Sequence, residues 1–217
     1  MSKAGEDSSE IILTGGVDLN VSQASRFAYK LNLDEAKYVF SKLPDMKQVR
    51  YGHSQVALDN ACYVIGGFCH DDFSGNAPQT LKSCEKFENN EWKSVANLNL
   101  ARAYAGCCAV PKTAIYIFGG LNGYETTNQI EQFIPQNNSW MVLSIKMPIK
   151  IAKLGAACVN AKTIILCGGI YGGESDTNFQ YINSSYKFEL GVVPKIGRFE
   201  KMIAKRTLYS TLPVYKG

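Results

Sequence analysis

The stretch Thr113-Ala-Ile-Tyr-Ile-Phe-Gly-Gly120 decides the fold of this chain. It is an apolar, partly β-branched run that ends in two glycines. Three further copies of the phrase occur at residues 10–16, 61–67 and 163–169. The glycine pairs of the four copies are Gly15-Gly16, Gly66-Gly67, Gly119-Gly120 and Gly168-Gly169. A phrase that returns about every fifty residues indicates a repeat architecture, in which each copy is one supersecondary unit.

Each repeat is predicted to contain four short strands. The apolar run is the second strand, and small residues before it, such as 105–109, form an inner strand. After the glycines, an alternating segment such as 130–133 predicts a third strand, because period-two alternation is typical of a half-buried strand. A polar turn follows, and Trp92 and Trp140 then open an outer strand in the second and third repeats.

Four antiparallel strands with short connections are typical of the blade of a β-propeller. Small side chains suit an inner strand, where blades crowd together. A second strand that lies between neighbouring blades is apolar throughout, and glycines let the backbone leave it in a conformation that a Cβ disfavours. The tryptophan fills the gap between blades, where its polar edge still finds a partner.

The sequence resembles the kelch family, whose motif is a hydrophobic strand ending in Gly-Gly, an alternating segment and a Trp at the start of the last strand. The residues that carry the resemblance are clearest in Ile115–Gly120, Glu131–Phe133 and Trp140. The resemblance implies an all-β kelch-type propeller of about four blades. It covers nearly the whole chain from about Glu10 onward.

The expected organisation is a flexible tail at 1–9 and a propeller at 10–217, with repeats at about 10–49, 50–101, 102–150 and 151–206. The first repeat has no evident inner strand, whereas residues 207–217 stand where an inner strand should follow the fourth repeat. We therefore expect residues 207–217 to pair with Glu10–Gly16 and close the ring, which removes an exposed sheet edge. The alternative is a partial ring that another chain completes.

Composition limits the function classes. Of 217 residues, 46% are hydrophobic and the formal charge is +4, which suits a globular body and does not argue for nucleic acid. The chain shows no apolar run of transmembrane length and no signal peptide. With seven cysteines and no Cys-x-x-Cys pair, we expect reduced thiols and a cytoplasmic location. No metal, cofactor or catalytic residue is predicted, since Cys69-His70-Asp71-Asp72 has no zinc spacing and only His53 and His70 are present.

Two function classes remain. The first is a non-catalytic protein-binding module that acts as a scaffold, an assembly subunit or a cytoskeleton-associated subunit. The second is an enzyme, since some kelch propellers modify sugars or act as oxidases. The chain could also be part of a larger kelch substrate adaptor. Because the sequence contains no cluster of titratable groups, we favour binding.

A binding face follows from strand direction. In an antiparallel blade, the connections that leave the second strand share one face with the segments that enter the next inner strand. These segments are basic, and the connections add aromatic residues and the acidic residues Asp71, Asp72, Glu125 and Glu174. We predict that this face receives an acidic protein segment. The predicted partner-binding residues are Arg50, Arg102, Lys150, Lys153, Arg206, Phe73, Tyr124 and Tyr171.

Overall fold

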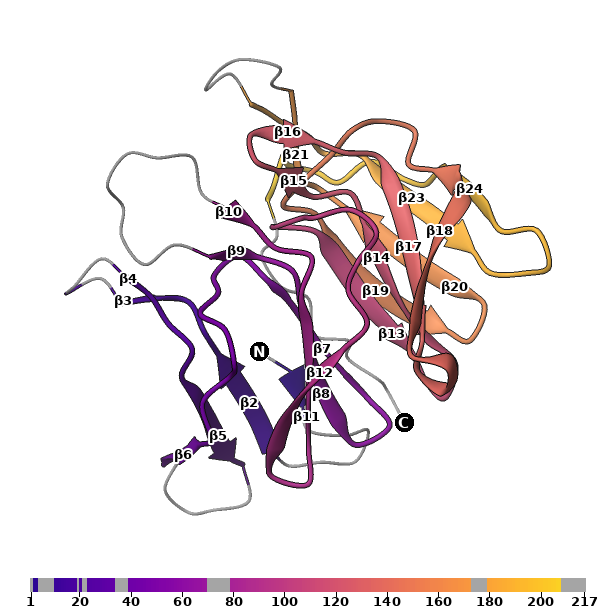
Figure 1. The fold of residues 1–217 in the computed structure, drawn as a ribbon. Coiled ribbons are helices and arrows are strands. Elements are labelled where there is room, and N and C mark those ends of the chain that lie inside the picture. The colour runs from indigo at the N-terminus through magenta and orange to yellow at the C-terminus, as the bar shows by residue number, and fades with distance from the viewer. Residues whose placement is uncertain are drawn as a thin grey trace.

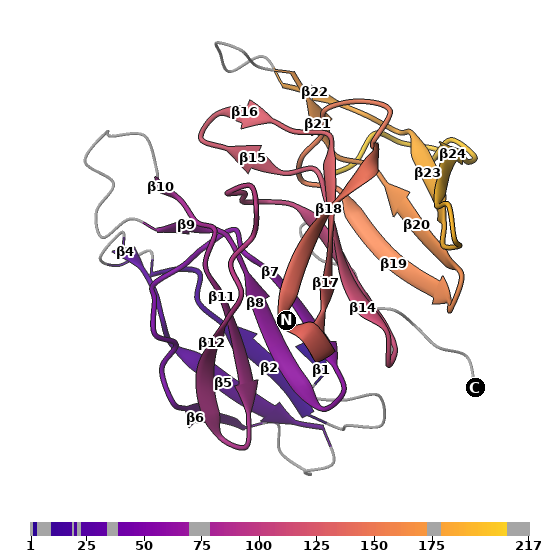
Figure 2. The same cartoon turned by 45° about the vertical axis from the view of Figure 1, so that its right-hand side comes forward.

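The computed structural model describes residues 2–3, 10–18, 20, 23–33, 39–69, 79–172 and 179–207. Four four-stranded antiparallel sheets follow one another along the chain and fan out side by side in an arc (Figure 1). The first and fourth sheets lie at opposite ends of this arc in both views (Figures 1 and 2). The all-β propeller architecture predicted from the sequence is confirmed, and each sheet is one blade.

Every blade has the same strand order, from the inner to the outer edge. Blade one contains β1 (Ser2–Lys3), β2 (Glu10–Thr14), β5 (Ala28–Asn32) and β6 (Phe40–Leu43). Blade two contains β7 (Ser54–Leu58), β8 (Ala61–Ile65), β11 (Cys84–Glu88) and β12 (Glu91–Val95). Blade three contains β13 (Gly106–Val110), β14 (Ala114–Phe118), β17 (Gln129–Ile134) and β18 (Ser139–Lys146). Blade four contains β19 (Gly155–Asn160), β20 (Thr163–Cys167), β23 (Ser185–Glu189) and β24 (Lys195–Arg198).

Shorter elements complete the fold. One 3-10 turn, η1 (Pro135–Asn137), joins β17 to β18. A two-stranded hairpin follows the second strand of every blade, and these four hairpins are β3 (Val17–Asp18) with β4 (Gln23–Ala24), β9 (Phe68–Cys69) with β10 (Gln79–Thr80), β15 (Leu121–Asn122) with β16 (Glu125–Thr126), and β21 (Ile170–Tyr171) with β22 (Gln180–Tyr181). In the part of the chain that the structure describes, no helix has the length and apolar character needed to cross a bilayer.

The first blade corrects the prediction about its inner strand. The edge of β2 that was assigned to residues 207–217 is paired with β1, through Ser2 opposite Ile12 and Lys3 opposite Ile11. Ser2–Lys3 is thus the inner strand of blade one and runs antiparallel to β2. Residues 1, 4–9 and 208–217 lie outside the described residues, and so does the rest of the closing-strand prediction.

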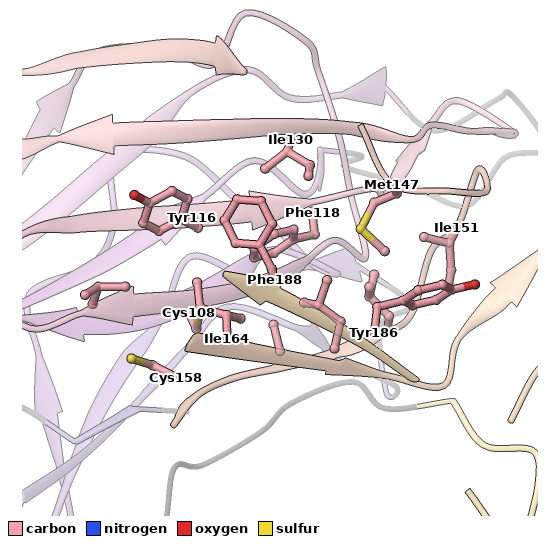
Figure 3. Close-up of a cluster of buried hydrophobic side chains, with 14 of the residues drawn as sticks. Cys108, Tyr116, Phe118, Ile130, Met147, Ile151, Cys158, Ile164, Tyr186 and Phe188 are labelled. Atoms are coloured by element: carbon pink, nitrogen blue, oxygen red, sulfur yellow. The ribbon is translucent and has the colours of Figure 1, made fainter. Parts of the chain in front are cut away.

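Apolar packing between adjacent blades makes the core. All five residues of β8 and all five of β14 are buried, because these strands have a blade on each side. At the junction of blades three and four, aromatic and aliphatic side chains from both sheets form one cluster (Figure 3). The predicted role of the tryptophans is confirmed, since Trp92 Nε1 donates to the Pro44 carbonyl of blade one at 2.8 Å and Trp140 Nε1 donates to the Ala96 carbonyl at 3.0 Å.

None of the seven cysteines, all of which lie in described segments, forms a disulfide. Burial raises the pKa of Cys84 to about 12 and also raises the pKa of Cys107 and Cys108 well above the ordinary range. Because the thiolate is the reactive species, these three thiols are inert at neutral pH.

Candidate functional site

The connections between strands meet on one face of the blades, as the strand directions predict. The residue after each blade junction pairs with the hairpin that follows the next double glycine: Tyr51 bridges Phe68, Ala103 bridges Leu121 and Ala152 bridges Ile170. The hairpins β9–β10, β15–β16 and β21–β22 therefore lie beside the segments that enter the inner strands, along one side of the arc (Figure 2). We call this side the hairpin face.

The hairpins are fastened to one another across blades. The Gly123 amide at the tip of β15–β16 donates to Thr80 Oγ1 of β10 at 2.7 Å. On the other side, Thr126 Oγ1 of the same hairpin donates to the Gly172 carbonyl after β21 at 3.4 Å. These contacts connect the hairpins of blades two, three and four, so their exposed side chains are presented on a continuous surface.

Strained backbone marks the point where the inner strands begin. Gly52, Tyr104 and Lys153 occupy equivalent positions in successive blades, and all three have left-handed backbone angles, with φ of 60°, 51° and 54°. Tyr104 N donates to the Gly52 carbonyl and Lys153 N donates to the Tyr104 carbonyl, each at 2.7 Å. A non-glycine residue in this region is costly, and such strain is concentrated at functional sites.

The side chains at this point form what we call the entry cluster: Tyr51, Phe68, Tyr104 and Lys153. The Phe68 ring lies between the two tyrosines, with centroid distances of 5.4 Å to Tyr51 and 5.7 Å to Tyr104. Lys153 Nζ stands 4.9 Å from the centroid of the Tyr104 ring, which is a cation–π geometry. Burial, with a smaller contribution from Tyr124, raises the pKa of Tyr51, so its hydroxyl stays neutral and can donate a hydrogen bond.

Arg50 is not a binding residue, although the sequence predicted one. Its side chain is completely buried in blade two, where it donates to Glu85 Oε1 at 2.8 Å and to the carbonyls of Gly66 and Ser83. Glu85 also accepts the backbone N–H groups of Lys47 and Gln48. The carboxylate of one blade therefore holds the segment that arrives from the preceding blade.

The prediction for Arg102 is corrected in the same way, because its side chain is buried in blade three. It donates to Glu131 Oε1 at 2.5 Å, and to the carbonyls of Gly119 and Gln129, with both charged side chains fully buried. Glu131 in turn accepts the backbone N–H groups of Asn99 and Leu100. We call each of these arrangements a clasp. Since water is excluded from both clasps, neither arginine can contact a partner.

The other predicted residues have different surroundings. Tyr124 is 65% exposed in the turn between β15 and β16, and Tyr171 is also exposed, with its hydroxyl donating to Gln180 Oε1 at 2.6 Å. Lys150 and Arg206 are exposed, whereas Lys153 is half-buried in the entry cluster. Phe73, together with Asp71, Asp72 and Glu174, lies outside the described residues.

Sequence reasoning missed Tyr51, Phe68 and Tyr104. It also misread the two arginines, although one signal distinguishes them from loop charges. Arg50 and Arg102 recur at the same place in the repeat, and so do Glu85 and Glu131 on the third strand. Loop charges vary from repeat to repeat, whereas charges of opposite sign that recur together indicate a structural pair.

His53, just before β7, makes the contact between blades one and two dependent on pH. Its Nε2 is 2.8 Å from Thr14 Oγ1 of blade one, and burial together with the nearby Arg50 charge lowers its pKa to about 3. The ordinary value is 6.5. Between these two pH values the unfolded chain binds a proton at His53 that the folded protein does not bind. The free energy of unfolding therefore has its full value, as far as His53 is concerned, above pH 6.5, and it decreases as the pH falls from 6.5 to about 3.

We therefore expect His53→Gln to flatten the acid side of the stability profile. Urea unfolding between pH 7 and pH 4 measures it, and the wild-type protein should lose up to about 1.4 kcal/mol per pH unit more than the variant. Parallel profiles for the two proteins would contradict the assignment.

Comparisons with known proteins agree with this architecture. The family model described as the Kelch motif matches residues 50–99 and 101–147. Kelch-like protein 40 of Xenopus tropicalis is 28% identical over 178 residues, which cover 80% of this chain and 27% of that protein. Alpha-scruin of Limulus polyphemus is 27% identical over 185 residues, which cover 79% of this chain and 19% of that protein.

A solved structure, that of YjhT, is similar to 94% of this chain with a TM-score of 0.72 and 13% sequence identity. At this identity the likeness concerns the fold alone. This chain covers 65% of the YjhT chain and about a quarter of the length of the kelch-like relatives.

Proposed function

Because the chain belongs to the kelch-repeat β-propeller family, we propose that it is a non-catalytic protein-binding module whose hairpin face receives an acidic segment of a partner protein. The proposal is supported by the kelch repeats that the chain shares with its relatives and by the aromatic and cationic side chains on the hairpin face. Lys153 stacks on Tyr104, and Tyr124 is exposed in the turn of the β15–β16 hairpin. Lys150, three residues before Lys153 in the sequence, is also exposed. Aromatic side chains combined with cations are typical of the centres of protein interfaces.

The observation that carries this proposal is the entry cluster on the hairpin face, in which Lys153 stacks on Tyr104 and both residues have a left-handed backbone. In blade two the equivalent residue is Gly52, which adopts the left-handed backbone without steric strain because it has no Cβ. Blades three and four instead hold large side chains there, at a cost of about 1–2 kcal/mol each. Lys112 has a similar φ of 56° in an exposed turn, so the left-handed backbone alone does not identify a ligand site. We infer that the side chains of Tyr104 and Lys153 contact a ligand because they also stack on each other in the entry cluster on the hairpin face.

Lys153→Gly separates binding from stability. The substitution relieves the backbone strain and removes the ammonium group, so we expect unchanged or slightly increased stability, by up to about 1 kcal/mol. Peptides selected from a random display library on the intact chain should be rich in Asp and Glu. Their affinity for the variant should fall about tenfold or more, because a charge-assisted contact is lost.

Lys112→Gly is the matched control, since Lys112 is an exposed lysine with the same left-handed backbone, φ of 56°, in the turn between β13 and β14 on the opposite side of the blade. It should leave peptide affinity unchanged. Equal losses from Lys153→Gly and Lys112→Gly would mean that charge alone attracts the peptides. Selection of peptides without acidic residues would reject the acidic partner.

A scaffold role in the cytoplasm, as a subunit of a larger assembly, is the wider form of the proposal. The seven cysteines without a disulfide support a reducing compartment. Purification of the tagged chain under native conditions, with Lys153→Gly in parallel, would identify proteins whose capture depends on the hairpin face. Mass measurement after alkylation without reductant should show seven modified thiols in the denatured protein.

A further inference from the structure

The turn that joins β23 to β24 is apolar, unlike its equivalents in the two preceding blades. We call residues 190–194, with the sequence Leu-Gly-Val-Val-Pro, the valine turn. Val192 is fully exposed and Val193 is 74% exposed. The equivalent turns of blades two and three consist of Asn89-Asn90 and Pro135–Asn138, which are polar. Two adjacent exposed valines at a position that is polar elsewhere indicate contact with an apolar surface.

The valine turn lies at the end of blade four opposite to the β21–β22 hairpin (Figure 1). Strand β20 leads into that hairpin, and β23 runs antiparallel to β20, so the turn after β23 is at the other end of the blade. The Leu190 N–H donates to the carbonyl of Lys162, in the turn between β19 and β20, at 2.8 Å. Val159 of β19, 56% exposed, lies at the same end.

The valine turn has no wall of protein beside it. A Cβ at Gly191 would meet its nearest atom, the Val193 carbonyl oxygen, at 3.8 Å, and a Cβ at Gly197 of β24 would meet no atom within 4 Å. Pro194 follows the valines and restricts the backbone of the turn. Among the residues that the structure describes, the two valines therefore project from a tip and do not line a groove.

Lysines surround the valine turn. Lys112, Lys162 and Lys195 are exposed in the turns of blades three and four at this end. Glu189 is the acidic residue among them, and Lys187 Nζ lies 2.6 Å from its Oε1. This hydrogen bond lowers the pKa of Glu189, so its carboxylate is ionised and is balanced by Lys187. The other three lysines leave this end with an excess of positive charge.

The positive charge is confined to the blades that adjoin the valine turn. Residues 110–114, 134–139, 159–163 and 189–195 make up the turns of blades three and four at this end, and they contain no other acid. At the same end of blade two, the turns carry Asp59, Glu88 and Glu91. The exposed valines and the unbalanced lysines therefore occur together.

We propose that the valine turn and its lysines bind the surface of a bilayer that contains anionic lipids. Val192 and Val193 would enter the boundary between headgroups and acyl chains, while the ammonium groups lie at the level of the lipid phosphates. A cytoplasmic leaflet is negatively charged and attracts each lysine near its surface. A protein partner would need an apolar pocket shaped to this tip, whereas a bilayer accepts a protruding apolar group of any outline. This inference is independent of the hairpin face.

Sedimentation of the intact chain with lipid vesicles tests the proposal. Vesicles of phosphatidylcholine with about 30% phosphatidylserine should bind the protein about tenfold or more tightly than vesicles of phosphatidylcholine alone. The double variant Val192→Ser with Val193→Ser should lower the partition coefficient about tenfold, because two apolar side chains no longer leave water. Lys162→Gln with Lys195→Gln should lower it to a similar extent and make binding less dependent on salt.

Matched controls remove the same groups elsewhere. Val39→Ser replaces a valine that is 55% exposed in blade one. Lys201→Gln with Lys205→Gln removes two exposed lysines from the segment that follows β24, on the side of the hairpins. Both variants should bind anionic vesicles as the natural chain does. The urea midpoint of every variant should stay at the wild-type value, which shows that the fold is intact.

A tryptophan at the tip distinguishes insertion from adsorption. The emission of Val192→Trp should shift to shorter wavelength on anionic vesicles and should be quenched by lipids with brominated acyl chains, because the indole enters the apolar boundary. Val39→Trp should show neither change. Trp92 and Trp140 are present in both variants, so their emission cancels in the comparison.

Equal binding to the two kinds of vesicle would overturn the proposal. So would an unresponsive Val192→Trp, or an equal loss of binding from Lys201→Gln with Lys205→Gln. Self-association of the chain without vesicles, seen in sedimentation velocity and abolished by Val192→Ser with Val193→Ser, would also overturn it by assigning the valine turn to a second copy.

Discussion

Replacing Arg102 with methionine should lower the free energy of unfolding by about 3–5 kcal/mol, because Glu131 is left charged and buried without its cation. The loss extends beyond the ion pair. Arg102 also holds the carbonyls of Gly119 and Gln129, and Glu131 holds the segment that arrives from blade two. Urea unfolding of the intact chain, followed by tryptophan fluorescence, measures the change.

The junction of blades three and four, where Ile151 and Tyr186 stand in place of the arginine and the glutamate, supplies a repair for this damage. The double variant Arg102→Ile with Glu131→Tyr copies the Ile151 and Tyr186 pair, and it should recover part of the lost stability, because an apolar pair can replace the buried ion pair but not the backbone hydrogen bonds of Arg102 and Glu131. Lys47→Met is the matched control, since that side chain is exposed in the equivalent segment, and its effect should stay within about 0.5 kcal/mol. If Arg102→Met costs no more than Lys47→Met, the clasp does not stabilise the junction.

Gly119→Ala should be the second severe substitution. Gly119 has φ of 59°, and a Cβ there would be closer to the Ile151 carbonyl oxygen than van der Waals contact permits. The neighbouring atoms are backbone, so they cannot move aside without breaking the hydrogen bond from Gly120 to that carbonyl. We expect a loss of at least about 3 kcal/mol, in the range of the most destabilising single substitutions.

Gly123→Ala separates the clash from the backbone strain. Gly123 has a nearly identical φ of 61°, but a Cβ there meets no atom within 4 Å. Its replacement should cost only about 1–2 kcal/mol, which is the strain of a left-handed alanine. Equal losses at the two glycines, measured by urea unfolding, would mean that the packing of the junction is not what requires Gly119.

The architecture was predictable because its signals are local and repeated. The Gly-Gly phrase marks the end of the second strand in every blade, and each of its glycines has a positive φ. Trp92 and Trp140 were interpreted correctly, since a large ring with one polar edge has few suitable places. The inner strand of blade one was not predicted, because Ser2 and Lys3 carry no apolar pattern that would mark a strand.

The binding face was only partly predictable. Strand direction gave the correct grouping of the connections, which the bridges of Tyr51, Ala103 and Ala152 confirm. From the sequence, Arg50, Lys150 and Arg206 were all predicted to be exposed binding residues, because the charge of a side chain does not show whether it pairs with a carboxylate in the next sheet. Tyr104 was overlooked since its left-handed backbone is visible only in three dimensions.

The two kinds of junction pair, the ionic clasps and the apolar pair of Ile151 and Tyr186, also determine which blades can be neighbours. Ile151 and Tyr186 match each other, as do Arg102 and Glu131, but an arginine placed against Tyr186 or an isoleucine against Glu131 would bury a charge without its counterion. Repeat proteins are prone to docking their units in the wrong order during folding. In this chain, blade three cannot be skipped: blade four docked directly on blade two would place Arg102 against Tyr186, and that error would be rejected by its electrostatic cost.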